Sequence, residues 1–502
     1  MIIKLAKKII DYFEDEKKNI LLYILTFFFI VCIRCLLEIF SINKYPSIEF
    51  HYHYLLFYIV VLIPLIILFY FATREKIEKV SKIVLSFFIT IFIGPIIDLL
   101  FFYGKDYKIE YLYPANTENL LISFITFFGN IKPPLSLGIR IEIAIILILS
   151  FIYFYIKTQK IIRSLFFVLL EYIIFFIFFS TPFFLFKISE YININVYNQI
   201  NFHTFYLLNI FIFLIFLYYL YNKNKFIAIF KDSRFLRIGH FCLLFVLGII
   251  IALDGNYNLT IIDFIKIFII FIIIILAWFF SVFTNNISDF KIDLISNKNR
   301  PLIKGIITKK DYIILSIFSF IFVILFSILI DYYILFLALV FISVYFLYSM
   351  PPLRLKQIPL FSKVMIAFNT LICFLMGYYF ITENFNAPFE YIVFIMVFFS
   401  LIINFIDIKD YKGDKSQNIL TLPTLLGLKK SKFIIGIFFL STHILAYFFF
   451  DFFYNIYHLL ILTILGIIQF YFINKKKYSE KPIFISYLSL ILLIIIHLIY
   501  FI

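Results

Sequence analysis

The sequence predicts an all-α polytopic membrane protein. Of its 502 residues, 64% are hydrophobic, well above the ~45–50% that is usual in soluble domains. Apolar runs recur along the whole chain, and most are close to the ~20 residues with which an α-helix crosses a bilayer. The runs are continuous rather than alternating, which favours spanning helices over the strands of a barrel.

The charge pattern supports the same conclusion. A formal net charge of +15 would suggest a nucleic-acid partner for a soluble protein. Here, however, Lys and Arg lie in short loops between apolar runs, as the positive-inside rule describes for membrane proteins. We therefore expect the lipid bilayer as a partner, and no nucleic acid.

Two features near the start of the chain need separate interpretation. Residues 1–19 mix charged and apolar side chains without an evident cleavable signal peptide, which is typical of an amphipathic helix at the membrane interface. Cys32 and Cys35 form a CxxC pair, a pattern found in redox and metal sites. This pair lies inside an apolar run without a second cysteine pair, so we expect a structural role.

Residues 1–230 are predicted to form an N-terminal membrane region with about six spans. The spans are expected near residues 20–40, 54–73, 80–102, 135–157, 161–186 and 203–221. The apolar stretch 119–130 is too short to cross a bilayer, so we expect it to be re-entrant or interfacial. The domain boundary is placed in the basic connector that follows, which contains Lys223, Lys225, Lys231, Arg234 and Arg237.

Residues 231–502 are predicted to form a second domain with nine spans. The spans are expected near residues 238–253, 261–287, 312–330, 332–349, 360–381, 388–408, 431–449, 455–473 and 483–501. Lys and Arg cluster in alternate loops of this domain. No Lys or Arg occurs in the intervening loops near 254–260, 330–333, 382–390 and 449–457. We therefore expect the basic loops to be cytoplasmic and the C-terminus to lie on the other side.

Two acidic clusters carry the candidate chemistry. Asn285, Asp289 and Asp293 are spaced by four residues, which places them on one face of a helix. A second set with spacings of three and four contains Asp407, Asp410 and Asp414. Both sets lie at the cytoplasmic end of a predicted span, so they can face each other across one cavity.

The composition of the clusters indicates the ion between them. Carboxylates near membrane depth are costly without a partner, and two like-charged clusters repel unless a cation separates them. Oxygen ligands suit Mg²⁺, which usually combines a few carboxylates with substrate phosphates. Neither cluster contains His or Cys, which argues against zinc or iron. We therefore predict Mg²⁺ and a bound diphosphate.

The segment between the clusters adds basic side chains at the same face. Residues 348–356 read YSMPPLRLK, in which two prolines interrupt the helix and form a turn. Arg354 and Lys356 follow this turn and are candidates for contacts with phosphate oxygens. Arg300, in the sequence NRPL at 299–302, is a further candidate. A basic cytoplasmic loop alone is not specific for phosphate.

Three signatures, in this order, resemble those of the UbiA prenyltransferase superfamily. The stretch from Asn285 to Gly305 resembles the first signature, and YSMPPLRLK resembles the middle loop. The stretch DIKDYKGDKSQNILTLPTLLG, residues 407–427, resembles the second Asp-rich signature. The resemblance covers residues 235–502, and nine spans match the architecture of the family.

The resemblance implies a prenyltransferase that uses Mg²⁺ and an isoprenoid diphosphate donor. The residues implied to bind Mg²⁺ and to be catalytic are Asp289, Asp293, Asp410 and Asp414. The residues implied to bind substrate are Asn285, Arg300, Arg354, Lys356, Asp407 and Tyr348. The metal and the basic groups would stabilise the leaving diphosphate, and the acceptor would attack an allylic carbocation in an apolar pocket.

The sequence departs from the family pattern at two places. Many members have Asp directly after the first Asn, where this chain has Asn286, so the number of Mg²⁺ ions stays open. The GI.T element after the second cluster is replaced by residues 418–421, which read NILT. The main Asp set is retained despite both changes.

Several functions are compatible with these residues. Our first hypothesis is transfer to an aromatic, quinone-type acceptor, and the alternative within the family is a lipid or glycerol-phosphate acceptor. Phosphatidyl-alcohol transferases also use Asp-rich helices, but they need a longer motif that Asp254-Gly255 does not continue. A non-enzymatic transporter or scaffold would instead pair these aspartates with buried basic groups and would have no affinity for diphosphate.

The first 230 residues resemble no family that we can name. Ionisable residues within or near predicted spans are functional candidates by default. They are Arg34, Glu38, Asp98, Arg140, Glu142 and Glu171. Arg34 and Glu38, four residues apart, would neutralise each other on one helix. An accessory role is favoured, and partner docking or a second enzyme stays open.

Overall fold

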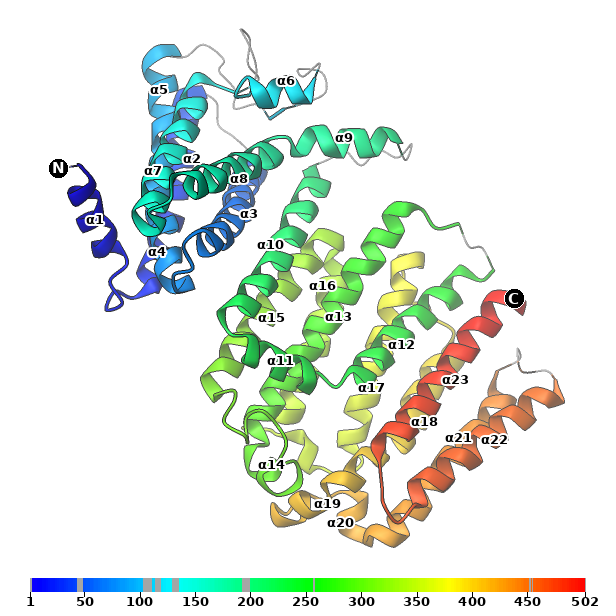
Figure 1. Cartoon of the computed structure of the whole chain (residues 1–502). Coiled ribbons are helices and arrows are strands. Elements are labelled where there is room, and N and C mark those ends of the chain that lie inside the picture. Colours follow the sequence, from blue (N-terminus) through cyan, green and yellow to red (C-terminus); the bar gives the residue numbers. More distant parts are fainter. Residues whose placement is uncertain are drawn as a thin grey trace. The chain divides into compact units, whose positions relative to one another are not determined.

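The computed structural model describes residues 2–42, 48–102, 111–112, 119–128, 135–191, 199–255, 258–450, 453 and 455–501. Every regular element within these ranges is a helix (Figure 1). The described part contains 15 helices that are long and apolar enough to cross a membrane. The chain is therefore an all-α polytopic membrane protein, as predicted. It divides into two units, Met1–Lys223 and Asn224–Ile502.

The N-terminal unit contains six of the candidate spans. Its helices are α1 (Ile2–Phe13), α2 (Ile20–Ile42), α3 (Ile48–Thr73), α4 (Ile77–Phe87), η1 (Phe88–Phe92), α5 (Ile93–Phe102), α6 (Leu120–Ile125), α7 (Leu137–Thr158), α8 (Ile161–Phe179), α9 (Thr181–Tyr191) and α10 (Gln199–Tyr221). The span predicted at 161–186 is wrong at its end, because the helix breaks after Phe179. Pro182, in the first turn of α9, has no N–H with which to continue the ladder of α8.

Polar contacts tie the start of the chain to the rest of the N-terminal unit. Glu14, which is buried just after α1, accepts hydrogen bonds from the Tyr153 hydroxyl at 2.9 Å and from Lys157 Nζ at 2.5 Å. The same lysine lies 3.2 Å from Glu75. Arg34 and Glu38 form the expected ion pair, at 2.7 Å. All four cysteines are free thiols, including the CxxC pair.

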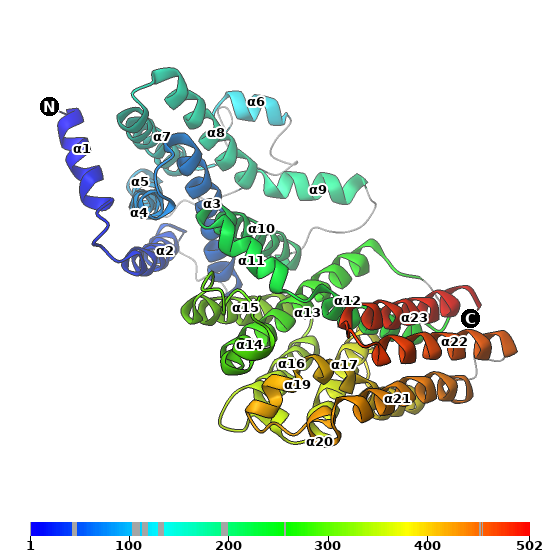
Figure 2. The same ribbon diagram turned by 60° about the horizontal axis from the view of Figure 1, so that its bottom comes forward.

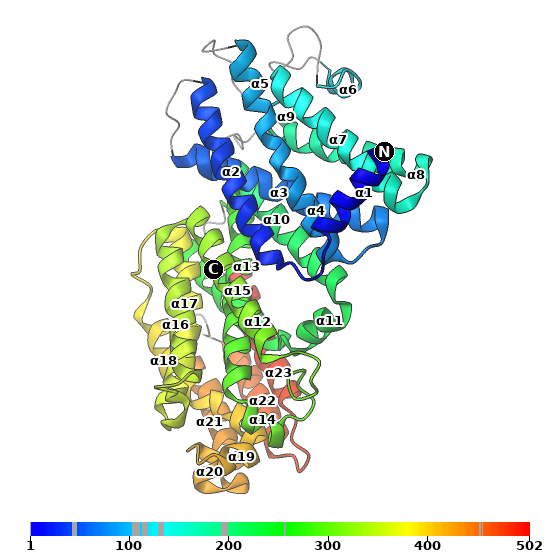
Figure 3. The same ribbon diagram turned by 90° about the vertical axis from the view of Figure 1, so that its left-hand side faces the viewer.

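The C-terminal unit contains the other nine candidate spans. Its helices are α11 (Lys223–Asp232), α12 (Phe235–Leu253), α13 (Ile261–Ser288), α14 (Phe290–Ser296), α15 (Lys309–Ile330), α16 (Tyr332–Ser349), η2 (Leu355–Gln357), α17 (Phe361–Thr382), α18 (Phe389–Ile402), η3 (Ile403–Ile406), α19 (Asp407–Ser416), α20 (Leu422–Leu426), α21 (Leu428–Phe449), α22 (Ile456–Asn474) and α23 (Glu480–Phe501). Figures 1 and 3 show α14, α19 and α20 together at one end of this bundle, which Figure 2 brings forward.

Small residues allow two central spans of this unit to pack closely. A Cβ at Gly248 of α12 would overlap the Phe374 carbonyl oxygen of α17, and a Cβ at Gly377 would overlap the Phe245 carbonyl oxygen. Such reciprocal approach of backbones is a common way in which helices associate in membranes, where lipid offers no hydrophobic drive for association. The pair holds α12 and α17 in a fixed register.

An apolar cluster supports the end that carries α19. Phe399, Phe405, Phe439 and Phe484 are all buried in it, on α18, η3, α21 and α23. Phe405 packs edge-on against Phe439 and Phe484, with ring centroids 5.6 and 4.9 Å apart. Large aromatic side chains thus fix the short helix η3, after which the second acidic cluster begins.

Candidate active site

A cavity of about 1100 Å³, counting its open mouth, lies at the end of the C-terminal unit where α14 and α19 meet. Nine of the predicted site residues line it: Asn285, Asp289, Asp293, Arg300, Tyr348, Lys356, Asp407, Asp410 and Asp414. The tenth, Arg354, does not line the cavity, but its Nη2 donates a hydrogen bond to Asp289 Oδ1 at 3.2 Å. The spacing of the acidic residues, together with the resemblance, therefore named residues that the fold brings together.

The two acidic clusters face each other through one amide. Nδ2 of Asn297 donates hydrogen bonds to Asp293 Oδ1 and to Asp410 Oδ1, each at 2.9 Å. Helices α14 and α19 approach closely enough for this because residue 413 of α19, at the contact with α14, is a glycine. A Cβ there would lie 2.5 Å from Ser296 Oγ, and the Gly413 N–H instead donates to that oxygen at 3.0 Å.

Basic side chains neutralise the first cluster. Asp289 forms ion pairs with Arg354 and Lys356, and Asp293 forms one with Arg300. Burial raises the pKa of Asp293 to about 6, and the Asp289 charge adds to this, whereas Arg300 and Asn297 oppose the shift. Asn285 Oδ1 accepts a hydrogen bond from Ser349 Oγ at 3.0 Å, which joins the end of α13 to the end of α16.

The second cluster is also largely buried. Asp407 pairs with Lys363 of α17, whose Nζ lies 2.7 Å from Oδ1 and 2.6 Å from Oδ2. Asp414, about two turns further along the same face of α19, is also buried, at 8% exposure. Carboxylates at this depth need a cation or hydrogen-bond donors to remain charged.

Several basic residues of the site pair with its aspartates, and a diphosphate bound in the cavity would have to exchange these ion pairs for contacts of its own. Within the described residues, no three His, Cys, Asp or Glu side chains are gathered closely enough to hold a metal ion by themselves. An open set of carboxylate oxygens around a polar cavity nevertheless fits Mg²⁺, which prefers oxygen ligands and shares them with substrate phosphates.

Sequence reasoning missed several cationic side chains of the cavity. Arg234, Arg237 and Lys363 line it, although the first two were assigned only to a connector, and Lys363, in the span predicted at 360–381, was not named as a site residue. Arg237 Nη2 donates to Glu480 Oε1 at 2.7 Å. These residues lie at or just before the start of predicted spans. A charged side chain at such a place is held by a rigid helix, and this feature of the sequence could have indicated them. The spacing of residues in the sequence does not show which side chain of another helix each of them contacts.

The departure at Asn286 has a structural reason. Its Oδ1 accepts hydrogen bonds from Arg234 at 3.0 Å and from Arg300 at 2.9 Å. Its Nδ2 donates to Asp232 Oδ2 at 2.6 Å, and the Tyr312 hydroxyl donates to the same oxygen at 2.9 Å. An aspartate at 286 could not donate to Asp232. The amide thus matches the residues of this particular chain.

Comparison with known proteins identifies the fold to which this site belongs. Residues 246–493 match the family model described as the UbiA prenyltransferase family. The C-terminal part of the chain belongs to this family. The match leaves the N-terminal unit outside, in agreement with its lack of recognisable motifs.

Named relatives of the UbiA region come from archaea. The chain is 32% identical over 177 residues to the digeranylgeranylglyceryl phosphate synthase of Methanobrevibacter smithii, an alignment that covers 32% of this chain and 60% of the relative. It is 28% identical over 193 residues to the synthase of the same name from Pyrococcus horikoshii, covering 38% of this chain and 66% of the relative. The chain thus spans less than two thirds of the length of either relative.

Solved structures of UbiA homologues also match the chain. A homologue from Archaeoglobus fulgidus bound to GPP and Mg²⁺ is 17% identical, with a TM-score of 0.44, and the match covers 54% of this chain and 99% of the homologue. The same homologue bound to DMAPP and Mg²⁺ gives a TM-score of 0.44 at 17% identity, covering 55% of this chain and 100% of the homologue.

Proposed function

We propose that the protein transfers a prenyl group from an isoprenoid diphosphate to an acceptor in a Mg²⁺-dependent reaction. The observation that carries this proposal is the bridge of Asn297 between Asp293 and Asp410, because it places the two acidic clusters against one polar cavity. Membership of the UbiA family and the Mg²⁺ and GPP of the homologue from Archaeoglobus fulgidus support the same proposal.

The aspartates would hold the metal, and the metal would neutralise the charge of the diphosphate. Asp289, Asp293, Asp410 and Asp414 supply the oxygen ligands. Arg300 and Lys356 would donate hydrogen bonds to the leaving diphosphate as its charge develops, which lowers the barrier to cleavage of the C–O bond. The basic loops that surround this end favour a cytoplasmic mouth for the cavity.

Aromatic walls would protect the allylic carbocation that forms. Phe241, Trp278 and Tyr345 line the cavity. The ring centroid of Trp278 lies 5.3 Å from that of Phe241 and 5.6 Å from that of Tyr345. Ring faces stabilise a cation, and their apolar surface excludes water that would capture it. The acceptor then forms the new bond.

We favour a lipid with a glyceryl phosphate group as the acceptor. Burial lowers the pKa of Arg234 to about 10, and the neighbouring Arg300 and Arg237 contribute to this shift. These three arginines line one cavity, and an anionic phosphate would accept hydrogen bonds from them. The names of the two archaeal relatives point to the same acceptor class. An aromatic acceptor stays the second candidate, favoured by the Trp278 and Tyr345 walls.

The experiment follows diphosphate release from geranylgeranyl diphosphate by the full chain in lipid nanodiscs with Mg²⁺. Release should fall at least a hundredfold in Asp289→Asn and in Asp410→Asn. Asp263→Asn is the matched control, because Asp263 caps the opposite end of α13 in an exposed turn. A labelled geranylgeranylglyceryl phosphate and a labelled 4-hydroxybenzoate compete as acceptors. Unchanged release in both variants would refute the proposed metal site.

A further inference from the structure

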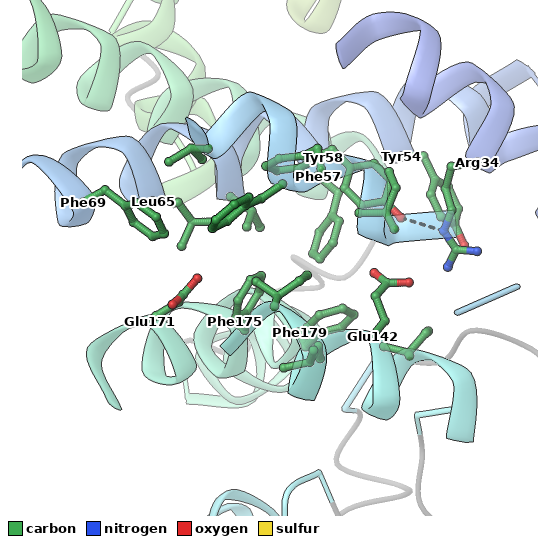
Figure 4. A pocket seen from close by; sticks show the side chains of 18 of the residues that line it. Arg34, Tyr54, Phe57, Tyr58, Leu65, Phe69, Glu142, Glu171, Phe175 and Phe179 are labelled. Atoms are coloured by element: carbon green, nitrogen blue, oxygen red, sulfur yellow. Dashed lines mark hydrogen bonds between the residues drawn. The ribbon is translucent and has the colours of Figure 1, made fainter. Parts of the chain in front are cut away.

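The N-terminal unit contains a cavity of its own, with polar ends and aromatic walls (Figure 4). It has about 800 Å³ of atom-free space, counting its open mouth. Apolar side chains from α3 and α8 form most of the wall that Figure 4 shows, including Phe57, Leu65, Phe69, Phe175 and Phe179. Such a lining, with few polar groups, is typical of sites for small apolar molecules.

A buried carboxyl group in this cavity has an unused oxygen. Glu171 of α8 has no solvent exposure. Ser150 Oγ donates to its Oε1 at 2.9 Å, whereas its Oε2 has no hydrogen-bond partner among the described residues. Figure 4 shows the carboxyl turned into the space between α3 and α8. Charged or protonated, the group leaves Oε2 unsatisfied, which is unfavourable by ~1–3 kcal/mol.

The arginine in the lining of this cavity does not serve this oxygen. Arg34, at the other end of the cavity in Figure 4, is already paired with Glu38 at 2.7 Å, and its Nε donates to the Tyr58 hydroxyl at 3.1 Å. Glu142 also lines the cavity, and its Oε2 accepts from the Gly94 N–H at 3.1 Å. The walls therefore carry more carboxyl groups than cations.

We propose that this cavity binds a small hydrophobic amine. Its ammonium group would donate a hydrogen bond to Glu171 Oε2 and pair with the charge of that carboxylate. Aromatic faces such as those of Phe69 and Phe175 would stabilise the cation, and the apolar body would lie against Leu65. A carboxylate or phosphate head group is excluded by Glu171 and Glu142. The proposal does not depend on prenyl transfer in the other unit.

Equilibrium dialysis of radiolabelled decylamine against the full chain in nanodiscs tests the proposal, with empty nanodiscs to subtract partition into lipid. We expect saturable binding of one amine per chain, and competition by unlabelled decylamine but not by decanoate. Glu171→Gln should weaken binding at least tenfold, because the amide keeps the shape and the Ser150 contact but lacks the charge. Glu190→Gln is the matched control, since Glu190 is an exposed carboxyl of the same unit.

A second variant distinguishes a lost site from a misfolded protein. Leu65→Phe adds volume within the cavity wall and should abolish amine binding while the variant keeps its thermal unfolding transition. Binding no stronger than to empty nanodiscs would overturn the proposal. Equal binding by wild type and Glu171→Gln, or tighter binding of decanoate than of decylamine, would also overturn it.

Discussion

The ammonium group of Lys363 lies 2.6 Å from Asp407 Oδ2, and less than a tenth of either side chain is exposed. This pair joins α17 to the start of α19, at the first residue of the second acidic cluster. Burial of two charges is tolerated here because each is the partner of the other.

Removal of the lysine should leave a buried charge. Lys363→Met is expected to destabilise the protein by ~3–5 kcal/mol, because Asp407 loses its counter-ion while it stays in the apolar surroundings of α17 and α19. The double variant Lys363→Met/Asp407→Leu should recover most of this loss. The free energy of unfolding of both variants can be measured by adding a denaturing detergent to the protein in a mild detergent. Equal stability of single and double variants would contradict the role of the pair.

The hydrogen bonds of Asn286 predict a reciprocal exchange. Asn286→Asp should destabilise the protein by ~1–3 kcal/mol, because it removes the donor to Asp232 and places two carboxylates 2.6 Å apart. Asp232→Asn combined with Asn286→Asp restores one donor and one acceptor and should recover stability. Thermal unfolding of the wild type and the two variants measures this. A double variant no more stable than Asn286→Asp would exclude the exchange.

The approach of α14 to α19 depends on Gly413. Gly413→Val should reduce Mg²⁺-dependent diphosphate release at least tenfold, because the added atoms would push α19 away from Ser296 and Ile292 and separate the two clusters. Gly239→Ala is the control, since a Cβ there meets only Leu488 Cδ1 at 3.6 Å. A Gly413→Val enzyme with wild-type activity and Mg²⁺ requirement would show that the close approach is dispensable.

The protonation of Asp293 should make Mg²⁺ binding depend on pH. Its pKa of about 6 means that ~90% of this carboxyl is protonated at pH 5, whereas an ordinary aspartate would still be charged. Mg²⁺ must displace that proton, so the Mg²⁺ concentration for half-maximal diphosphate release should rise about tenfold from pH 7 to pH 5. Activity titrations at both values test this. The same half-maximal concentration at both would contradict the raised pKa.

The sequence predicted the acidic clusters but not the contacts that join them. Spacing by three and four assigned Asp289 and Asp293 to one face because helix geometry is local and regular. Asn297 was not predicted as the bridge, since its partner Asp410 lies more than a hundred residues later. For the same reason, Glu171 was recognised only as an intramembrane ionisable residue, and neither the cavity nor the contact with Ser150 could be derived.

Because the bridge between the clusters is an amide, the site is held together by a neutral group. The two N–H bonds of Asn297 Nδ2 serve two carboxylates without adding charge. When a cation takes over those oxygens, the displaced amide is easily satisfied by water. A lysine at position 297 would compete with the metal, because its positive charge would be attracted to the same carboxylates. In the proposed metal site, the amide would therefore keep the clusters aligned before the ion binds and would release their oxygens when it binds.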